Sequence, residues 1–307
     1  MRPAVYWFRS DLRLADNPAL IDACSQAKRL ALLYVVPEGE LRPTRWGFER
    51  TGPHRRHFRD QALAALAGAL ALQGGELLIA EGDPVATVTR LARDIGAADV
   101  FCEAIAAPEE MAECAALRAL GLIVHERWQS SLLEPADLPF EIAETPRVFT
   151  TFRQALERAG VTPRPPCAGP SRLPAAPETS LETRSAALAT RVLPDGASFP
   201  FTDPEFHGGE PTALRHLKRY FDSAAPRHYK ETRNALSGVD YSTKFSPWLA
   251  IGALTARTLS LAMVRAPVGN HTRARPRGIL KNGSDPLNAL HRVCRKSSPE
   301  TESAAAE

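Results

Sequence analysis

Short apolar stretches alternate with helix-like stretches through the first 130 residues, and this pattern constrains the fold more than any other feature. The apolar runs are rich in β-branched and aromatic residues and lie at 3–8, 29–37, 76–80, 98–102 and 122–126. Between them apolar residues recur with helical spacing, as in the stretch from His54 to Leu72. Strands joined by helices of this length form right-handed crossovers. The pattern therefore predicts a doubly wound, Rossmann-like parallel sheet covered by helices on both faces.

A nucleotide-binding function does not follow from this fold alone. The chain has neither a G-x-G-x-x-G after the first strand nor a G-x-x-x-x-G-K-[ST] anywhere. Charged residues do gather directly after the first strand: Arg9, Asp11, Arg13 and Asp16. We interpret them as a structural cluster that orients the turn, in preference to a catalytic group.

Composition divides the chain into four parts. Residues 3–130 form the α/β domain, and residues 131–200 contain a connecting helix and a linker in which eight of the 40 residues from 161 to 200 are Pro. Residues 201–264 are a partial helical domain. Residues 265–307 lack a helical period and are typical of a disordered tail, with a basic nucleic-acid arm as the alternative.

The helical part contains a basic helix after Gly208 and Gly209. Its spacing places three apolar residues on one face and three basic residues on another: Leu214, Leu217 and Phe221, and Arg215, Lys218 and Arg219. We expect the basic face to be simply solvated.

A second helix is predicted to start near Ser246, which we take as its N-cap, with Pro247 in the first turn. An apolar stripe follows at Trp248, Leu249, Ile251 and Leu254. Helix amino termini bind anions through free amides and the helix dipole, and hydroxyls at Ser242, Thr243 and Ser246 with the Lys244 ammonium add donors. An ordinary capped helix is an equally good interpretation.

Several motifs resemble the DNA photolyase and cryptochrome family, most closely its cryptochrome-DASH branch. They are WFRSDLRLADNPAL at 7–20, TGPHRRHF at 51–58, F-x-G-G-E-x-x-A-L-x-x-L from 206, YKETRN from 229 and DYSTKFSPWL from 240. The resemblance implies an FAD site formed by Tyr229, Ser242, Thr243, Lys244, Phe245 and Ser246. It also implies a DNA contact at Arg233.

The resemblance implies a blue-light flavoprotein that repairs cyclobutane pyrimidine dimers, as the carbon–carbon lyase deoxyribodipyrimidine photolyase does, or that senses light. Its DNA partner would be damaged or single-stranded, because the base must leave the stack. The likeness ends near residue 265, where the family continues with further helices. A non-catalytic, truncated relative that acts as an interaction module or has no function is the alternative, and a general nucleotide-binding domain is a weaker third interpretation.

In many relatives an acidic residue after the fourth strand holds a folate antenna. The matching position here is Ile105 or Ala107, depending on the alignment, and neither side chain has a carboxylate. This weakens the case for a folate antenna. Glu109 and Glu110 are explained by their place in the first turn of the next helix.

The remaining features predict a soluble, cytoplasmic protein. Hydrophobic content is 44% and charged content 24%, and the five cysteines and eight histidines form no disulfide framework or metal-ligand pattern. We expect no metal and no membrane span. If the flavin pocket is incomplete, the face with Trp248 and Leu254 should be exposed and promote association.

Overall fold

A five-stranded parallel sheet forms the core of the chain, as the alternating pattern predicts. The computed structural model describes residues 2–186, 193–194, 199–232 and 241–265. The strand order is β3-β2-β1-β4-β5. The strands are β1 (Pro3–Phe8), β2 (Arg29–Pro37), β3 (Leu77–Gly82), β4 (Asp99–Glu103) and β5 (Ile123–Arg127).

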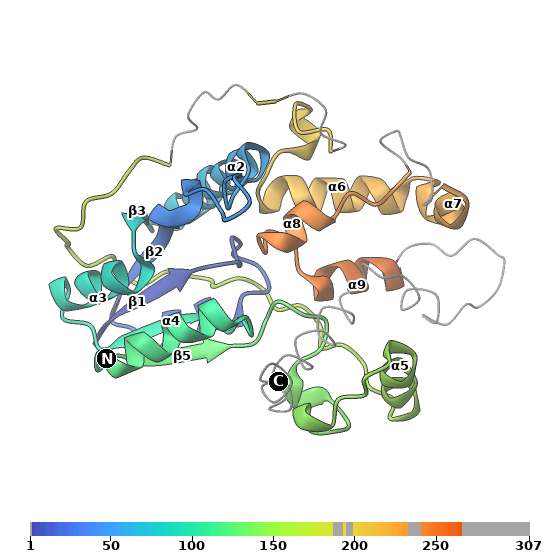
Figure 1. The fold of residues 1–307 in the computed structure, drawn as a ribbon, viewed down its shortest axis with the longest axis horizontal. Helices are drawn as coiled ribbons and strands as arrows, with labels where there is room; N and C mark the ends of the chain where they lie inside the picture. Colours follow the sequence, from blue (N-terminus) through green and yellow to red (C-terminus); the bar gives the residue numbers. More distant parts are fainter. Residues whose placement is uncertain (1, 187–192, 195–198, 233–240, 266–307) are drawn as a thin grey trace.

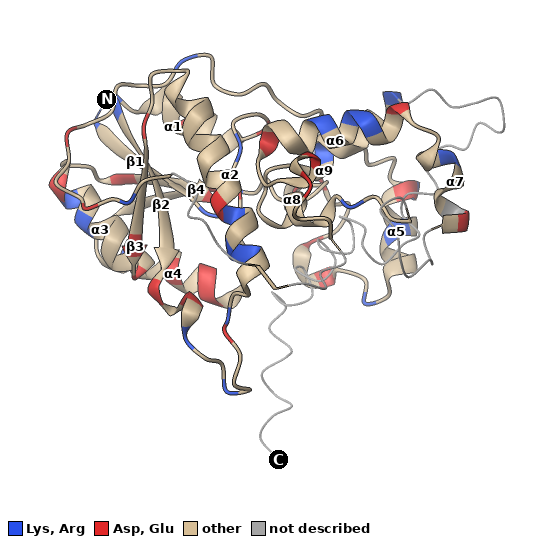
Figure 2. Cartoon of the chain, turned by 90° about the horizontal axis from the view of Figure 1, so that it is seen from above, with Lys and Arg blue, Asp and Glu red and all other residues tan. Residues whose placement is uncertain are grey.

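Four helices cover the two faces of this sheet (Figures 1 and 2). They are α1 (Pro18–Gln26), α2 (Pro53–Ala71), α3 (Pro84–Asp94) and α4 (Pro108–Ala119). Each has a proline in its first turn, where a missing N–H costs nothing. Asn17 caps α1 by accepting from the Leu20 amide, and Asp83 caps α3 in the same way.

Alternation along β1 assigns its side chains to two separate cores. Tyr6 and Phe8 are buried with α1 and α2, whereas Val5 and Trp7 are buried with α3 and α4. Both faces are therefore apolar, as expected for a parallel sheet covered on both sides. Trp7 is a core residue, and Trp128 is partly buried beside a smaller cluster.

After β5 the chain forms α5 (Phe149–Arg158) and then runs extended along the sheet domain. Short 3-10 turns precede α5 at Pro135–Asp137 and Ile142–Glu144, and another follows β2 at Glu38–Leu41. We call residues 171–186 the strap. It is pinned by hydrogen bonds from the Leu30 amide to the Ala175 carbonyl (3.1 Å) and from the Arg184 amide to the Ile79 carbonyl (2.8 Å).

A second group of helices, which we call the helical segment (residues 204–265 where described), lies beside α2 in Figure 1. It contains a 3-10 turn (Pro204–Phe206), α6 (Glu210–Asp222), α7 (Ala225–Thr232), α8 (Ser246–Ala250) and α9 (Ala256–Arg265). Gly208 brings its backbone against α2: an added Cβ would lie 2.0 Å from the Phe58 carbonyl oxygen. The chain could not pass there with a larger residue.

Two details of the predicted helices are wrong. Leu214 does not share the buried face of α6, since it is 39% exposed. The buried positions of this helix are Thr212, Ala213, His216 and Leu217. The apolar stripe from Trp248 to Leu254 is not one helix, because α8 ends at Ala250 and Gly252 turns the chain with φ of +66°.

Candidate functional site

The Ser242–Ser246 turn connects to α8 and presents most of the predicted ligand-binding residues together. Ser242, Thr243 and Lys244 are half-buried, Phe245 is buried and Ser246 is exposed. Within the part of the chain that the structure describes, the hydroxyls of Ser242, Thr243 and Ser246 make no hydrogen bond. These donors are therefore available to a ligand with oxygen acceptors.

The predicted helix-terminus chemistry needs correction. The N-cap of α8 is Phe245 and not Ser246, and no side chain accepts a hydrogen bond from the first amides. With only five residues, α8 has a small dipole. Binding of an anion at this turn would depend on hydroxyls and backbone amides.

The Lys244 side chain contacts the aromatic ring of Tyr241, three residues earlier in the chain. The Lys244 backbone is left-handed, with φ of +57°, and its ammonium lies 3.8 Å from the centre of the Tyr241 ring. A cation held on an aromatic face gains about 0.5–1 kcal/mol at an exposed site. The charge is thus held at the rim of the turn by Tyr241.

Side chains from α6 support the turn from behind. His216 is buried, and its Nε2 lies 2.9 Å from the Thr243 carbonyl oxygen, while Arg219 Nη2 lies 3.2 Å from His216 Nδ1. Because a guanidinium can only donate, Nδ1 accepts, and Nε2–H donates to Thr243. Sequence reasoning missed His216, although its spacing from Ala213 places it on the apolar face.

An aromatic cluster fixes α8 beneath the turn. Trp248 is fully buried, its Nε1 donates to the His207 carbonyl (3.0 Å), and its ring lies within 6.2 Å of four other rings: Phe58, Phe199, Phe206 and His216. Leu254 is also buried, at 3% exposure. The expectation that this face is exposed is therefore wrong, because α2 and α6 already cover it.

Tyr229 lies on α7 and reaches the turn only through intermediates. Burial raises the pKa of Tyr220 to about 12, and the neighbouring Tyr229 phenol adds to the increase. Tyr220 in turn packs edge-on against Phe245, with ring centres 5.4 Å apart. Arg233, the predicted DNA contact, lies outside the described residues.

The basic residues of α6 are exposed, and Figure 2 marks their positions as blue segments of the helix. Lys218 pairs with Asp222 and Arg219 with Glu205, and Arg215 donates to the Thr212 hydroxyl (3.0 Å). These charges are exposed and partly neutralised, in agreement with a solvated face.

The charged residues after β1 hold the helical segment against the sheet. Arg13, buried at 2% exposure, donates to the carbonyls of Asp16 (2.9 Å) and Gly252 (2.9 Å). Asp16 accepts from Arg257 in a buried ion pair of 2.9 Å. The cluster is thus structural, as predicted, but most of its partners are backbone groups and residues far along the chain.

Glu210 adds a further link that sequence reasoning did not reveal. Its carboxylate accepts from the amides of Leu14 (2.9 Å) and Ala15 (3.1 Å). Burial raises the pKa of Glu210 although these amides favour the charged form. This residue therefore connects the first turn of α6 to the loop after β1.

The carboxyl end of β4 contains a fully buried acid, Glu103. Neither of its oxygens makes a hydrogen bond of good geometry, although the Ser10 amide lies close enough to favour the ionised form. Burial, and next the Asp11 carboxylate, raise the pKa of Glu103 well above its usual value.

The loop that corresponds to the antenna-binding stretch of many relatives, where the sequence makes a folate antenna doubtful, follows Glu103 directly. Ala107 occupies the N-cap position of α4 and offers no side-chain acceptor. Glu109 and Glu110 lie in the first turn of α4, as expected, and Glu109 pairs with Arg50. No carboxylate therefore replaces the missing one at Ile105 or Ala107 itself.

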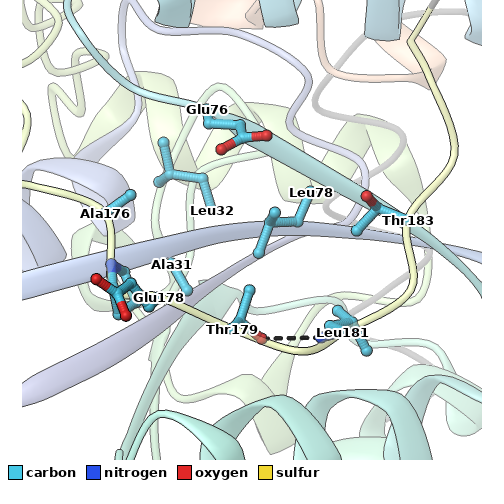
Figure 3. A pocket seen from close by; sticks show the side chains of 10 residues that line it. Ala31, Leu32, Glu76, Leu78, Ala176, Glu178, Thr179, Leu181 and Thr183 are labelled. Atoms are coloured by element: carbon cyan, nitrogen blue, oxygen red, sulfur yellow. Dashed lines mark hydrogen bonds between the residues drawn. The ribbon is translucent and has the colours of Figure 1, made fainter.

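Other candidate sites are weaker. Among the described residues no group of three or more His, Cys, Asp or Glu could hold a metal ion, and no helix there has the length and apolarity needed to cross a membrane. A cavity of about 370 Å³ lies between the strap and the amino-terminal halves of β2 and β3 (Figure 3). Ligands of such sheets bind at the carboxyl ends of the strands, so this cavity lies at the opposite edge.

A family model described as DNA photolyase matches residues 4–171. Cryptochrome DASH of Natronomonas pharaonis is 37% identical over 268 residues, which cover 84% of this chain and 55% of the relative. The chain spans about half the length of the curated relatives it matches.

Solved structures give the same result. The cryptochrome of Synechocystis is similar with a TM-score of 0.79 and 31% identity, covering 96% of this chain and 60% of that one. A bacterial class III photolyase from Agrobacterium tumefaciens is similar with a TM-score of 0.69 and 26% identity, covering 96% and 57%. In both comparisons the match covers 96% of this chain and so extends beyond the sheet domain.

Proposed function

Because the chain belongs to the DNA photolyase family, we propose that its helical segment forms one wall of an FAD site. Its three unpaired hydroxyls on a turn supported by His216 and Phe245 fit a diphosphate, whose oxygens are acceptors. Ser242, Thr243 and Ser246 would donate to the diphosphate. Tyr229 and Lys244 would border it, and Phe245 would hold the turn in place.

The flavin, when bound and reduced, supplies blue-light absorption and an electron for a pyrimidine dimer. The chain's own residues would bind and orient the cofactor. His216 binds the Thr243 carbonyl and so holds the backbone of the turn against α6. The aromatic cluster around Trp248 keeps water from the back of the turn.

DNA would be the partner of such a protein, with Arg233 contacting it and a damaged or single-stranded site preferred. We further propose a cytoplasmic location and, within that, activity as a cryptochrome-DASH-like repair enzyme or light sensor. Phosphate contact by an arginine predicts binding that weakens as salt concentration increases. A filter-binding series over salt concentration, with the Arg233→Gln variant, tests this partner.

The observation that carries the FAD proposal is the set of free hydroxyls, and titration of the purified chain with FAD tests it. Hydrogen bonds to charged groups contribute about 1.5–3 kcal/mol, so the double variant Ser242→Ala/Thr243→Val should bind FAD at least about tenfold more weakly. Ser25→Ala, an exposed hydroxyl on α1, is the matched control and should change nothing. Equal affinity in the double variant, or no FAD binding by the wild type, would refute the proposal.

A further inference from the structure

Two thiols approach each other behind the sheet, away from the proposed FAD turn. Cys102 on β4 and Cys114 on α4 have Sγ atoms 4.0 Å apart, and both residues are buried. A disulfide needs a separation of about 2.05 Å, so the two sulfurs must approach each other by about 2 Å for the bond to form. Cys24 and Cys167, the other cysteines in the described residues, are also free thiols, and the Cys167 sulfur lies 3.7 Å from the Asp16 carboxylate.

A guanidinium lies against one of these thiols. Arg9, whose side chain is 4% exposed, has Nη1 at 3.6 Å from Cys114 Sγ and stacks over the Trp7 ring at 4.5 Å. Its Nη2 pairs with Glu113 (2.6 Å) and donates to the Glu110 carbonyl (3.1 Å). This network fixes the positive charge beside sulfur, and a neighbouring cation favours the thiolate, which is the reactive form.

We propose that Cys102 and Cys114 form a redox-active pair that closes to a disulfide when the protein meets a peroxide. The Cys114 thiolate attacks one peroxide oxygen, the O–O bond breaks, and the leaving hydroxide takes a proton to become water. The Cys114 sulfenic acid is then attacked by the Cys102 sulfur, the S–O bond breaks, and a second water leaves with the Cys102 proton. Two thiols thus lose two electrons and two protons to one peroxide.

The acidities of the two thiols agree with these roles. The contact between the two sulfurs lowers the pKa of Cys114, burial opposes this shift, and Arg9 lowers the pKa further. The same contact, together with burial, raises the pKa of Cys102 well above its usual value. By contrast, burial raises the pKa of Cys24 to about 11. Because the Arg9 guanidinium lies against Cys114 Sγ, at 3.6 Å, we take Cys114 as the attacking sulfur and Cys102 as the resolving one.

Access is limited by two acidic side chains that are not themselves buried. Glu113 and Glu126 adjoin Cys114, and their side chains are 28% and 24% exposed. Cys114 itself is only 1% exposed, so we expect a small peroxide to reach its sulfur only when one of these side chains moves. The disulfide would join α4 to β4 next to the loop at residues 104–107.

Peptide mapping of the full chain after treatment with hydrogen peroxide tests the proposal. The expected product is a cross-linked pair of peptides containing Cys102 and Cys114, formed at least about tenfold faster than any oxidation of Cys24, as one pKa unit of extra thiolate requires. Cys102→Ser should leave a Cys114 sulfenic acid that dimedone traps. Cys24→Ser is the matched control and should leave the cross-link unchanged.

Three results would overturn the proposal: alkylation of both thiols after treatment, oxidation of Cys24 before Cys114, or a Cys114 sulfinic acid without any disulfide. A supporting role for Arg9 predicts that Arg9→Gln slows cross-linking about tenfold while the circular dichroism spectrum is unchanged. If the Arg9→Gln variant fails to fold, the proposal is still tested, because peptide mapping of the wild-type chain alone shows whether the disulfide forms.

Discussion

The two faces of the sheet differ in how they are closed. The face with Val5 and Trp7 is covered by α3 and α4, and its core is completed almost entirely by residues of the sheet domain. The face with Tyr6 and Phe8 is covered by α1 and α2, but its core continues into the helical segment through Phe206, Leu217 and Trp248. One face is self-sufficient, whereas the other requires residues that are about 200 positions away in the sequence.

The difference shows that the helical segment is part of the fold of the sheet domain. Direct backbone contacts support this conclusion, since the Leu12 amide donates to the Ile251 carbonyl at 3.1 Å. We therefore expect protease protection to extend through α9, although a truncated interaction module would be cut soon after residue 160. Substitutions that affect only one of the two faces test this comparison through their effects on stability.

The largest effect is expected for Gly252→Ala. Its Cβ would lie 1.8 Å from the Ser10 carbonyl oxygen, and its φ of +66° disfavours any side chain. The Ser10 backbone cannot move away from the added Cβ as a flexible side chain could, so we expect a loss of about 4 kcal/mol in the free energy of unfolding. Urea denaturation measures the loss, and hydrogen exchange should show α8 and α9 released before β1.

The control for this variant is Gly68→Ala in α2, where an added Cβ meets nothing within 4 Å. Alanine favours a helix over glycine, so this change should be neutral or stabilising by up to about 1 kcal/mol. Equal losses in the two variants would show that the junction is not sensitive to close approach.

A smaller loss is expected for Arg257→Met, which leaves the buried Asp16 carboxylate without its ion-pair partner. Removing one member of a buried pair typically costs about 3 kcal/mol. Arg118→Met on α4 is the matched control, because its pair with Glu126 is partly exposed and contributes less than about 1 kcal/mol. Thermal denaturation of both variants should place the larger loss at the shared face, and the reverse order would contradict the comparison.

An intermediate effect concerns pH and Glu103, whose pKa burial raises in the folded state. A raised pKa means that the folded protein binds this proton more tightly than the unfolded chain. The stabilisation is complete below the unfolded pKa of about 4.5 and is lost as pH rises through the folded pKa, by up to about 1.4 kcal/mol per unit.

Glu103→Gln should therefore flatten the decline in stability between pH 5 and 8, whatever its effect at one pH. Urea denaturation at several pH values measures the slope. Glu178→Gln on the exposed strap is the control and should keep the wild-type slope. An unchanged slope in Glu103→Gln would mean that this carboxyl titrates normally.

The smallest effect is expected for Leu214→Gln, since this side chain is 39% exposed on α6. Its loss in the free energy of unfolding should stay within about 0.5 kcal/mol. Leu217→Gln, one turn further along α6, replaces a side chain that is 6% exposed and should cost several times more. Similar losses would indicate that the helix is rotated relative to this structure.

The sheet and its four helices could be predicted because each leaves a local period in the sequence. The contact between the sheet domain and the helical segment could not be predicted, because the residues that form it are far apart in the sequence. Glu210 binds the amides of Leu14 and Ala15, and Arg257 pairs with Asp16. Gly252 illustrates the limit, since its requirement for glycine comes from the Ser10 backbone and not from its neighbours. The residues of the proposed site were recognisable in the sequence as a motif. Their support by His216 could be seen only once the structure showed how α6 packs against the turn.

The strap has a consequence for how copies of this protein meet. Strand β3 is an edge strand of the sheet. The unpaired backbone groups of an uncovered edge strand can pair with a strand of another molecule. Hydrogen bonding of Arg184 to Ile79, with the Arg184 side chain paired to Asp60 and Glu81, occupies that edge with the chain's own backbone. We therefore expect the strap to hinder the addition of a strand from another copy at this edge.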